Sequence, residues 1–210
     1  PLLEIGSCIS RRHFLGGVLT AAASSWSPNR SLSSHSQVTP HRLDRALIAI
    51  TLDLEMSRNF PTWDQTHWDY FKGDLDQDSK KYALEASQRI KESSGVGHFF
   101  VVGRVFEQEN VNWLREIVEG GHSVGNHTYD HVNVKATKLE DIQFRFRRAP
   151  WLIQGKKPHE VIAENIRLTN LALKTRLGII PAGFRTPGGF PNGITDRPDL
   201  QELLLSLGFK

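Results

Sequence analysis

From about residue 46 to the end of the chain, short apolar segments alternate with longer amphipathic ones. The first apolar run, 46–52, has the length of a strand that is buried on both faces. Helical spacing of apolar residues follows over 79–91, with Asp78 as the expected N-cap, and a second apolar run covers 96–102. Strands and helices that alternate at these lengths imply parallel strands with right-handed crossovers, so the sequence predicts an α/β protein.

The same alternation continues beyond residue 102. The further predicted elements are a helix over 111–118, a strand over 122–125, a helix start at the capping-box sequence 137–140, a long helix from Pro158, a strand over 179–184 and a helix over 200–207. In parallel α/β folds the functional residues gather at the carboxyl ends of the strands. The residues that follow each predicted strand are therefore the first place to look for a site.

Composition excludes several classes of protein. The 210 residues suffice for one domain with a buried core, and the 26 basic and 23 acidic residues are interleaved, which argues against a nucleic-acid partner. No apolar stretch approaches the roughly 18 residues that cross a bilayer, so no integral membrane segment is expected in the mature form. The single cysteine, Cys8, cannot form an internal disulfide or a thiolate cage. Any metal must therefore use His, Asp or Glu.

The first forty residues differ from the rest. Arg11 and Arg12 precede a short apolar run over 14–23 that ends in three alanines, and a Ser- and Pro-rich linker follows over 24–40. This segment resembles a twin-arginine secretion signal, which predicts use of the twin-arginine export machinery and a periplasmic or extracellular location. An ordinary amphipathic helix with a chance arginine pair is the alternative. The expected division is an export signal and linker over 1–40 and a catalytic domain over 41–210.

Polar residues follow three of the predicted strands. Asp53 and Glu55 come after the first strand and are two residues apart, so in extended chain both side chains point the same way. His127 and His131 follow the third strand, and on a helical turn their spacing would place both imidazoles on one face. Arg185 follows the fourth. Two imidazoles and one carboxylate leave a position open for water, which is typical of a catalytic divalent site. Solvated acids, structural histidines and a simple turn are the alternative interpretations.

The order of these motifs resembles that of a known family. T-L-D-L-E at 51–55, G-N-H-T-Y-D-H at 125–131 and F-R-T-P-G-G at 184–189 are similar to the motifs of the polysaccharide deacetylase (NodB-homology) family. The histidine motif, with its lead-in G-H-S-V-G at 121–125, is the most specific part, and the resemblance extends over about 46–209. It implies a deformed (β/α) barrel, which would be incomplete at its C-terminal end because the chain stops at Lys210.

The resemblance also implies a mechanism. A divalent ion, with zinc as the expected metal, would activate a water molecule for hydrolysis. The reaction would remove N-acetyl groups from a glycan such as peptidoglycan, a chitin-like polymer or an exopolysaccharide. The implied roles are Asp53 as general base, Arg185 as the residue that orients it, Gly188 as a backbone donor to the oxyanion, and Glu55, His127 and His131 as metal ligands. Hydrolysis of an acetyl ester or a cyclic amide, and a noncatalytic glycan-binding module, are the alternatives.

The sequence departs from the family pattern in three places. Leu54 separates two acids that are adjacent aspartates in most members, Gly188 stands where many carry an aromatic residue, and the late catalytic-acid histidine has no counterpart. Because departure of the amine needs protonation, we expect the 210-residue chain to be a weaker deacetylase than a form with that histidine.

An aromatic segment follows the first motif. Trp63 and Trp68 are predicted to stack on sugar rings of the acetylated polysaccharide, with Pro187 as a further substrate contact. The alternative is that these aromatic rings pack a long loop onto the domain.

Overall fold

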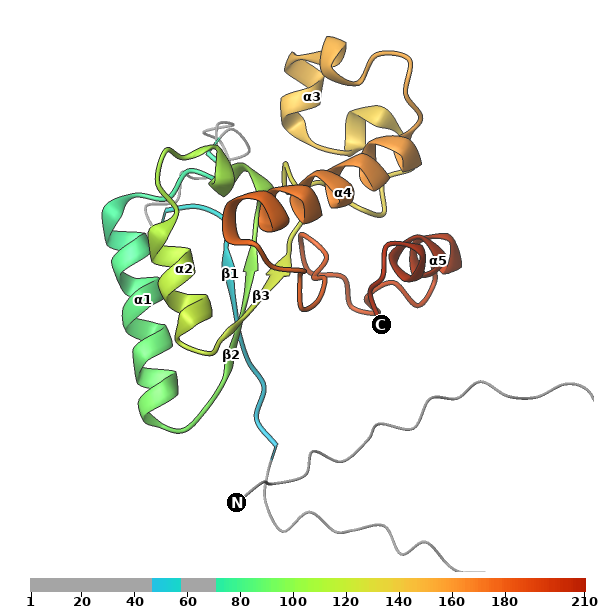
Figure 1. Ribbon diagram of the computed structural model, residues 1–210. Coiled ribbons are helices and arrows are strands. Elements are labelled where there is room, and N and C mark those ends of the chain that lie inside the picture. Colours follow the sequence, from blue (N-terminus) through green and yellow to red (C-terminus); the bar gives the residue numbers. More distant parts are fainter. Residues whose placement is uncertain (1–46, 58–70) are drawn as a thin grey trace, which may run out of the picture. The chain divides into compact units, whose positions relative to one another are not determined.

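The computed structural model describes residues 47–57 and 71–210, which fall within one compact unit. Its sheet contains three parallel strands in the order β1 (Ile50–Leu54), β2 (Gly97–Val101) and β3 (Ser123–Asn126) (Figure 1). The register pairs Asp53 with Phe100 and Val101 with Asn126, so the strands end side by side. The α/β fold with a parallel sheet is confirmed. Closure into a barrel is not shown by the described residues and stays a prediction.

One face of the sheet is covered by the two crossover helices, α1 (Gln77–Glu92) and α2 (Asn112–Glu119) (Figure 1). The side chains of Phe99 and Val101 on β2 and Val124 on β3 are buried against Leu114 and Ile117 of α2. Burying each such side chain contributes about 1.5–3 kcal/mol, so this cluster fixes the height and direction of the strands. The carboxyl ends of the strands are thereby held in place at one edge.

A second apolar cluster lies beyond β3 and supports the loop that carries the histidine motif. It involves η3 (Leu139–Asp141), α3 (Phe144–Arg148), η4 (Pro150–Ile153), α4 (Pro158–Leu177) and α5 (Pro198–Ser206). Its fully buried members are Val132, Val134, Ile142, Val161, Ile162 and Ile166. The helix predicted from Pro158 is confirmed, and α4 contacts both β3 and the short helix η2 (Gly103–Glu107).

Several local predictions are wrong. The first strand covers Ile50–Leu54 instead of 46–52, and Leu47 and Ile48 before it are exposed, so this apolar run is not buried on both faces. Asp76, not Asp78, caps α1, because its Oδ1 accepts a hydrogen bond from the Ser79 backbone N–H at 2.7 Å. The strand predicted over 179–184 is reduced to a single bridge between Asn126 and Phe184. The two N–H groups of this segment that donate to β3, those of Ala182 and Arg185, are three residues apart, so the regular two-residue alternation of a strand is lost. The helix predicted from 137–140 is only the short turn η3.

The helix near residue 140 ends early because the side chain of Gln143 makes hydrogen bonds outside it. This buried residue has an extended backbone; its side chain donates to the Asp130 carbonyl at 3.0 Å and accepts from the Arg145 N–H at 2.6 Å. A continuous helix would carry that side chain away from Asp130.

The export signal, the linker, Trp63 and Trp68 lie outside the described residues. No helix in the described part of the chain has both the length and the apolar character needed to cross a membrane.

Candidate metal centre

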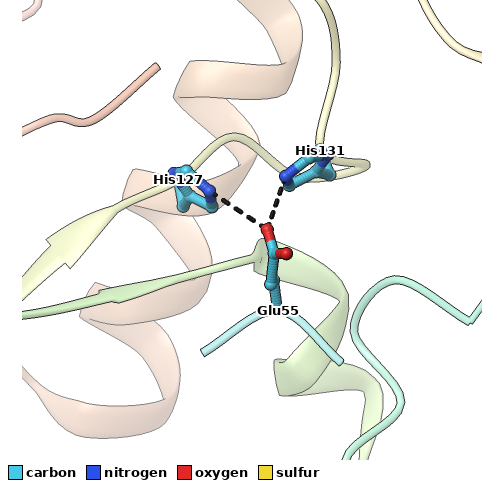
Figure 2. A group of neighbouring side chains, drawn as sticks. All are labelled: Glu55, His127 and His131. Atoms are coloured by element: carbon cyan, nitrogen blue, oxygen red, sulfur yellow. Dashed lines mark ion pairs between the residues drawn. The ribbon is translucent and has the colours of Figure 1, made fainter. Parts of the chain in front are cut away.

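Three potential metal ligands converge beyond the ends of β1 and β3. Glu55 follows β1, whereas His127 and His131 lie in the loop after β3 (Figure 2). One ligand atom from each lies within 4.8 Å of the other two. Glu55 Oε2 is 2.6 Å from His131 Nε2 and 3.4 Å from His127 Nε2. A carboxylate and two imidazoles form a donor set that suits a divalent transition metal ion and leaves coordination positions open.

The histidine loop is not helical, so the prediction that both imidazoles share a helical turn is wrong. Thr128 and His131 have left-handed backbone φ angles of 59° and 57°, an uncommon conformation for residues with a side chain. The Thr128 hydroxyl accepts a hydrogen bond from the Val132 N–H at 3.0 Å and so closes the loop on itself. This tight turn brings His131 back beside His127, with ring centroids 5.0 Å apart. Such strain is characteristic of functional sites.

The orientation of His127 provides a test of whether a cation fits. Its Nδ1 lies 3.0 Å from the backbone carbonyl oxygen of Arg185, which can only accept, so Nδ1 carries the hydrogen in this contact. In neutral His127 the Nε2 lone pair then faces a carboxylate oxygen of Glu55. Two acceptors that face each other require a positive charge between them, either a proton or a metal ion. The fixed tautomer is the one that metal-ligating histidines adopt.

The electrostatics of the three groups favour the ligating forms. Burial alone would raise the pKa of Glu55, but its contacts with His127, His131 and Lys72 reverse the effect, and the net pKa lies far below its usual range. Burial lowers the pKa of His131, although Glu55 opposes the shift. The carboxylate is therefore charged and the His131 imidazole tends toward its neutral form, as a metal ligand requires.

Buried polar residues hold the histidine loop against α4. Asn126, which is fully buried, donates through Nδ2 to the Ile166 carbonyl at 2.8 Å and to Asn170 Oδ1 at 2.6 Å, and its Oδ1 accepts from the Thr128 N–H at 2.8 Å. Asn165 Oδ1 accepts from the Asp130 N–H at 2.8 Å. Sequence reasoning missed these residues. The available signal was the presence of Asn165 and Thr169 at buried positions on the otherwise apolar face of α4.

The predicted base and arginine also come together. Arg185 Nη1 donates to Asp53 Oδ1 at 2.8 Å, and Nη2 donates to Thr51 Oγ1 at 2.5 Å. The guanidinium carbon lies 4.7 Å from the centre of the Phe100 ring, in cation–π geometry. Asp53 is 33% exposed, so solvent and a bound molecule have access to it. The side chain of Arg185 thus fixes the direction of a carboxylate beside the candidate metal centre.

The remaining predicted site residues have different outcomes. Gly188 is exposed, and its φ of 82° favours glycine, so its N–H remains a candidate oxyanion donor. Pro187 is buried, which leaves its ring little surface to offer a substrate.

His98 packs against Phe100, the residue that also contacts Arg185, and its protonation should make stability depend on pH. Its ring stacks on Phe100 with centroids 4.1 Å apart, and within the described residues its buried Nε2 has no hydrogen-bond partner. Burial lowers the pKa of His98 from 6.5, and the Arg185 guanidinium lowers it further. The unfolded chain therefore binds a proton more readily, so the stability that neutral His98 contributes is lost as the pH falls below about 6.5.

We expect the free energy of unfolding to decrease less between pH 7 and pH 5 in His98→Gln than in the wild type. Denaturant unfolding at the two pH values measures this, with His159→Gln, an exposed change on α4, as the control. Equal decreases in the wild type and His98→Gln would contradict the assignment.

Comparison with known proteins places this chain in a family. The family model for polysaccharide deacetylases matches residues 74–205, more than half of the chain. A chitooligosaccharide deacetylase of Azorhizobium caulinodans is 33% identical over 60 residues, which cover 29% of this chain and 28% of that protein. The chain thus matches less than a third of the length of this curated relative.

Solved structures with related folds include a CE4 family pseudoenzyme from Bacillus anthracis, studied as a mutant with restored enzymatic activity. That mutant has 17% identity and a TM-score of 0.49, and the match covers 79% of this chain and 43% of that chain. A family 4 acetyl xylan esterase from Clostridium thermocellum, in complex with a cobalt ion, has 18% identity and a TM-score of 0.38, with 66% and 47% covered. By the match of the family model, the chain belongs to the polysaccharide deacetylase family.

Proposed function

We propose that this protein is a metal-dependent hydrolase that removes N-acetyl groups from an acetylated polysaccharide. The observation that carries the proposal is the convergence of Glu55, His127 and His131 beside the Asp53–Arg185 pair in a chain of this family. The two groups of residues are physically linked, because the Arg185 carbonyl orients His127 while the Arg185 side chain holds Asp53.

Each residue has a defined task in the proposed reaction. Glu55, His127 and His131 would hold one divalent ion, for which zinc suits this ligand set best. When bound, such an ion lowers the pKa of water and polarises a carbonyl oxygen. Asp53 accepts the proton of the attacking water. Arg185 keeps the Asp53 carboxylate aimed at that water, which is a positioning effect.

The backbone of the 184–189 segment supplies the last component. The exposed N–H of Gly188 is the candidate donor to the oxygen that becomes negatively charged when water attacks the acetamide. A donor of this kind typically contributes about 2.7–4 kcal/mol to lowering the barrier. The C–N bond then breaks as the nitrogen takes up the proton that Asp53 received from water, and acetate and the free amine of the sugar are released.

The choice of an acetamide over an ester is supported by the likeness to the chitooligosaccharide deacetylase. The same residues would also attack an acetyl ester. A panel of N-acetylglucosamine oligomers, acetylated xylan and a cyclic imide therefore tests the substrate class, with acetate release as the measurement for the first two and ring opening for the third.

The experiment that tests the proposal is removal and restoration of the metal. We expect chelation followed by dialysis to abolish acetate release from N-acetylglucosamine oligomers, and added zinc to restore it. His127→Ala should be inactive with or without zinc because it removes a ligand. His159→Ala, which replaces an exposed histidine at the start of α4, should behave as the wild type. Hydrolysis that survives chelation, or that survives His127→Ala, would overturn the proposal.

A further inference from the structure

A buried lysine stands beside the proposed metal centre, and the reaction described above does not use it. Lys72 is 2% exposed, and its Nζ lies 2.7 Å from Glu55 Oε1. Lysine is almost never fully buried unless its charge is paired. The other oxygen of the same carboxylate, Oε2, faces both His127 and His131. The two oxygens of Glu55 are therefore divided between the lysine and the imidazoles.

The backbone around Lys72 is fixed directly to the end of β1. The Gly73 N–H donates to the Glu55 carbonyl at 2.6 Å, and the Ser57 N–H donates to the Asp74 carbonyl at 3.1 Å. Gly73 has a φ of 92°, and a Cβ at this position would lie 2.3 Å from the Cβ of Arg104, so only glycine fits there. The segment that carries Lys72 is thus held at a set distance from Glu55.

The positive charge of Lys72 alone does not explain why a lysine lies beside the proposed metal centre. A second positive charge near a bound cation repels it, so an ammonium group is an unfavourable neighbour for a metal ion. Its hydrogen bond to Oε1 has the opposite effect. A free glutamate side chain loses rotamer entropy when a metal ion orders it, whereas a side chain that is already anchored has lost that entropy before the ion binds.

We infer that Lys72 is a positioning residue of the metal centre, which holds Glu55 Oε1 so that Oε2 is presented to the cation together with His127 and His131. This inference rests on the proposed function, since it assumes that the three ligands bind a metal ion. Partners that orient metal ligands in this way typically contribute 10–100-fold to metal affinity.

The test is zinc affinity, measured by competition with a chromogenic chelator. Lys72→Met removes the hydrogen bond and should weaken zinc binding about 10-fold or more. Lys72→Gln keeps an N–H donor but removes the charge, so it should bind zinc at least as tightly as the wild type. Lys81→Met, the same chemical change on the exposed surface of α1, should leave zinc affinity unchanged.

A double-mutant cycle separates positioning from a general structural role. If Lys72 acts through Glu55, Lys72→Met should not weaken zinc binding in a Glu55→Ala background. Equal weakening in both backgrounds would overturn the inference, as would tighter zinc binding by both Lys72→Met and Lys72→Gln, or no change in Lys72→Met. If the wild type binds no zinc, the proposed function fails and this inference with it; if only the lysine variants disagree, the proposed function stands.

The inference can still be tested if Lys72→Met fails to fold. Removal of one partner from a buried pair leaves an uncompensated charge, whereas removal of both partners is tolerated far better. Circular dichroism and thermal unfolding of Lys72→Met with Glu55→Ala should then show a folded protein. If the double variant is also unfolded, the lysine serves the fold rather than the carboxylate, and the inference is wrong.

Discussion

Replacement of Asp53 by asparagine is expected to lower the rate of acetate release by about 10²–10⁴-fold, the usual contribution of a general base. Asparagine has almost the same shape but cannot accept the proton of the attacking water. Arg185 would lose a charged partner, although the amide oxygen can still accept a hydrogen bond from its Nη1. The measurement is kcat on N-acetylglucosamine oligomers, together with zinc affinity.

The distinguishing feature of this variant is an intact metal centre. Asp53 is not one of the three converging ligands, so zinc affinity should stay close to that of the wild type. Asp78→Asn, an exposed change in the first turn of α1, is the matched control and should retain full activity. If Asp53→Asn loses zinc binding along with activity, Asp53 is a ligand rather than a base. If it retains activity, another group takes the proton.

Replacement of Asn126 by alanine should produce the largest loss of stability among the changes considered. The Thr128 N–H would lose its partner in a buried setting, and Asn170 Oδ1 would lose one in a half-buried setting. Each unsatisfied group costs roughly 1–3 kcal/mol, so we expect the free energy of unfolding to fall by about 2–6 kcal/mol. Denaturant unfolding monitored by circular dichroism measures the loss.

A matched asparagine controls for the side-chain change itself. Asn112 is exposed at the start of α2, and Asn112→Ala should change the free energy of unfolding by no more than about 0.5 kcal/mol. A loss in Asn126→Ala that is no larger than this would show that water replaces the missing hydrogen bonds. It would also mean that Asn126 does not hold the histidine loop in place.

Much of the fold could be predicted from periodicity, because apolar spacing is a local property of the sequence. The strands near residues 50, 99 and 124 and the long helix from Pro158 have clear patterns, and all four are present. The strand near residue 181 could not be predicted correctly, since this apolar run pairs with β3 irregularly and forms only one bridge.

The candidate site shows the same contrast between local and distant information. Glu55, His127 and His131 could be proposed because each follows an apolar strand. Lys72 gives no such signal, since it occurs in a polar segment and its burial depends on the fold of residues 71–76 against β1 and η2. The left-handed turn at Thr128 and His131 also depends on distant contacts, because its hydrogen bonds come in part from α4.

Arg185 contacts both His127 and Asp53, so the position of one cannot change independently of the other. Its main chain sets the tautomer of one imidazole, and its side chain sets the direction of the carboxylate at residue 53. A side-chain substitution alters only the second contact, whereas any displacement of the peptide backbone between Phe184 and Thr186 disturbs both. In the proposed reaction, metal binding and proton transfer therefore both depend on the placement of one peptide unit, and insertions or deletions in that segment should impair the two together.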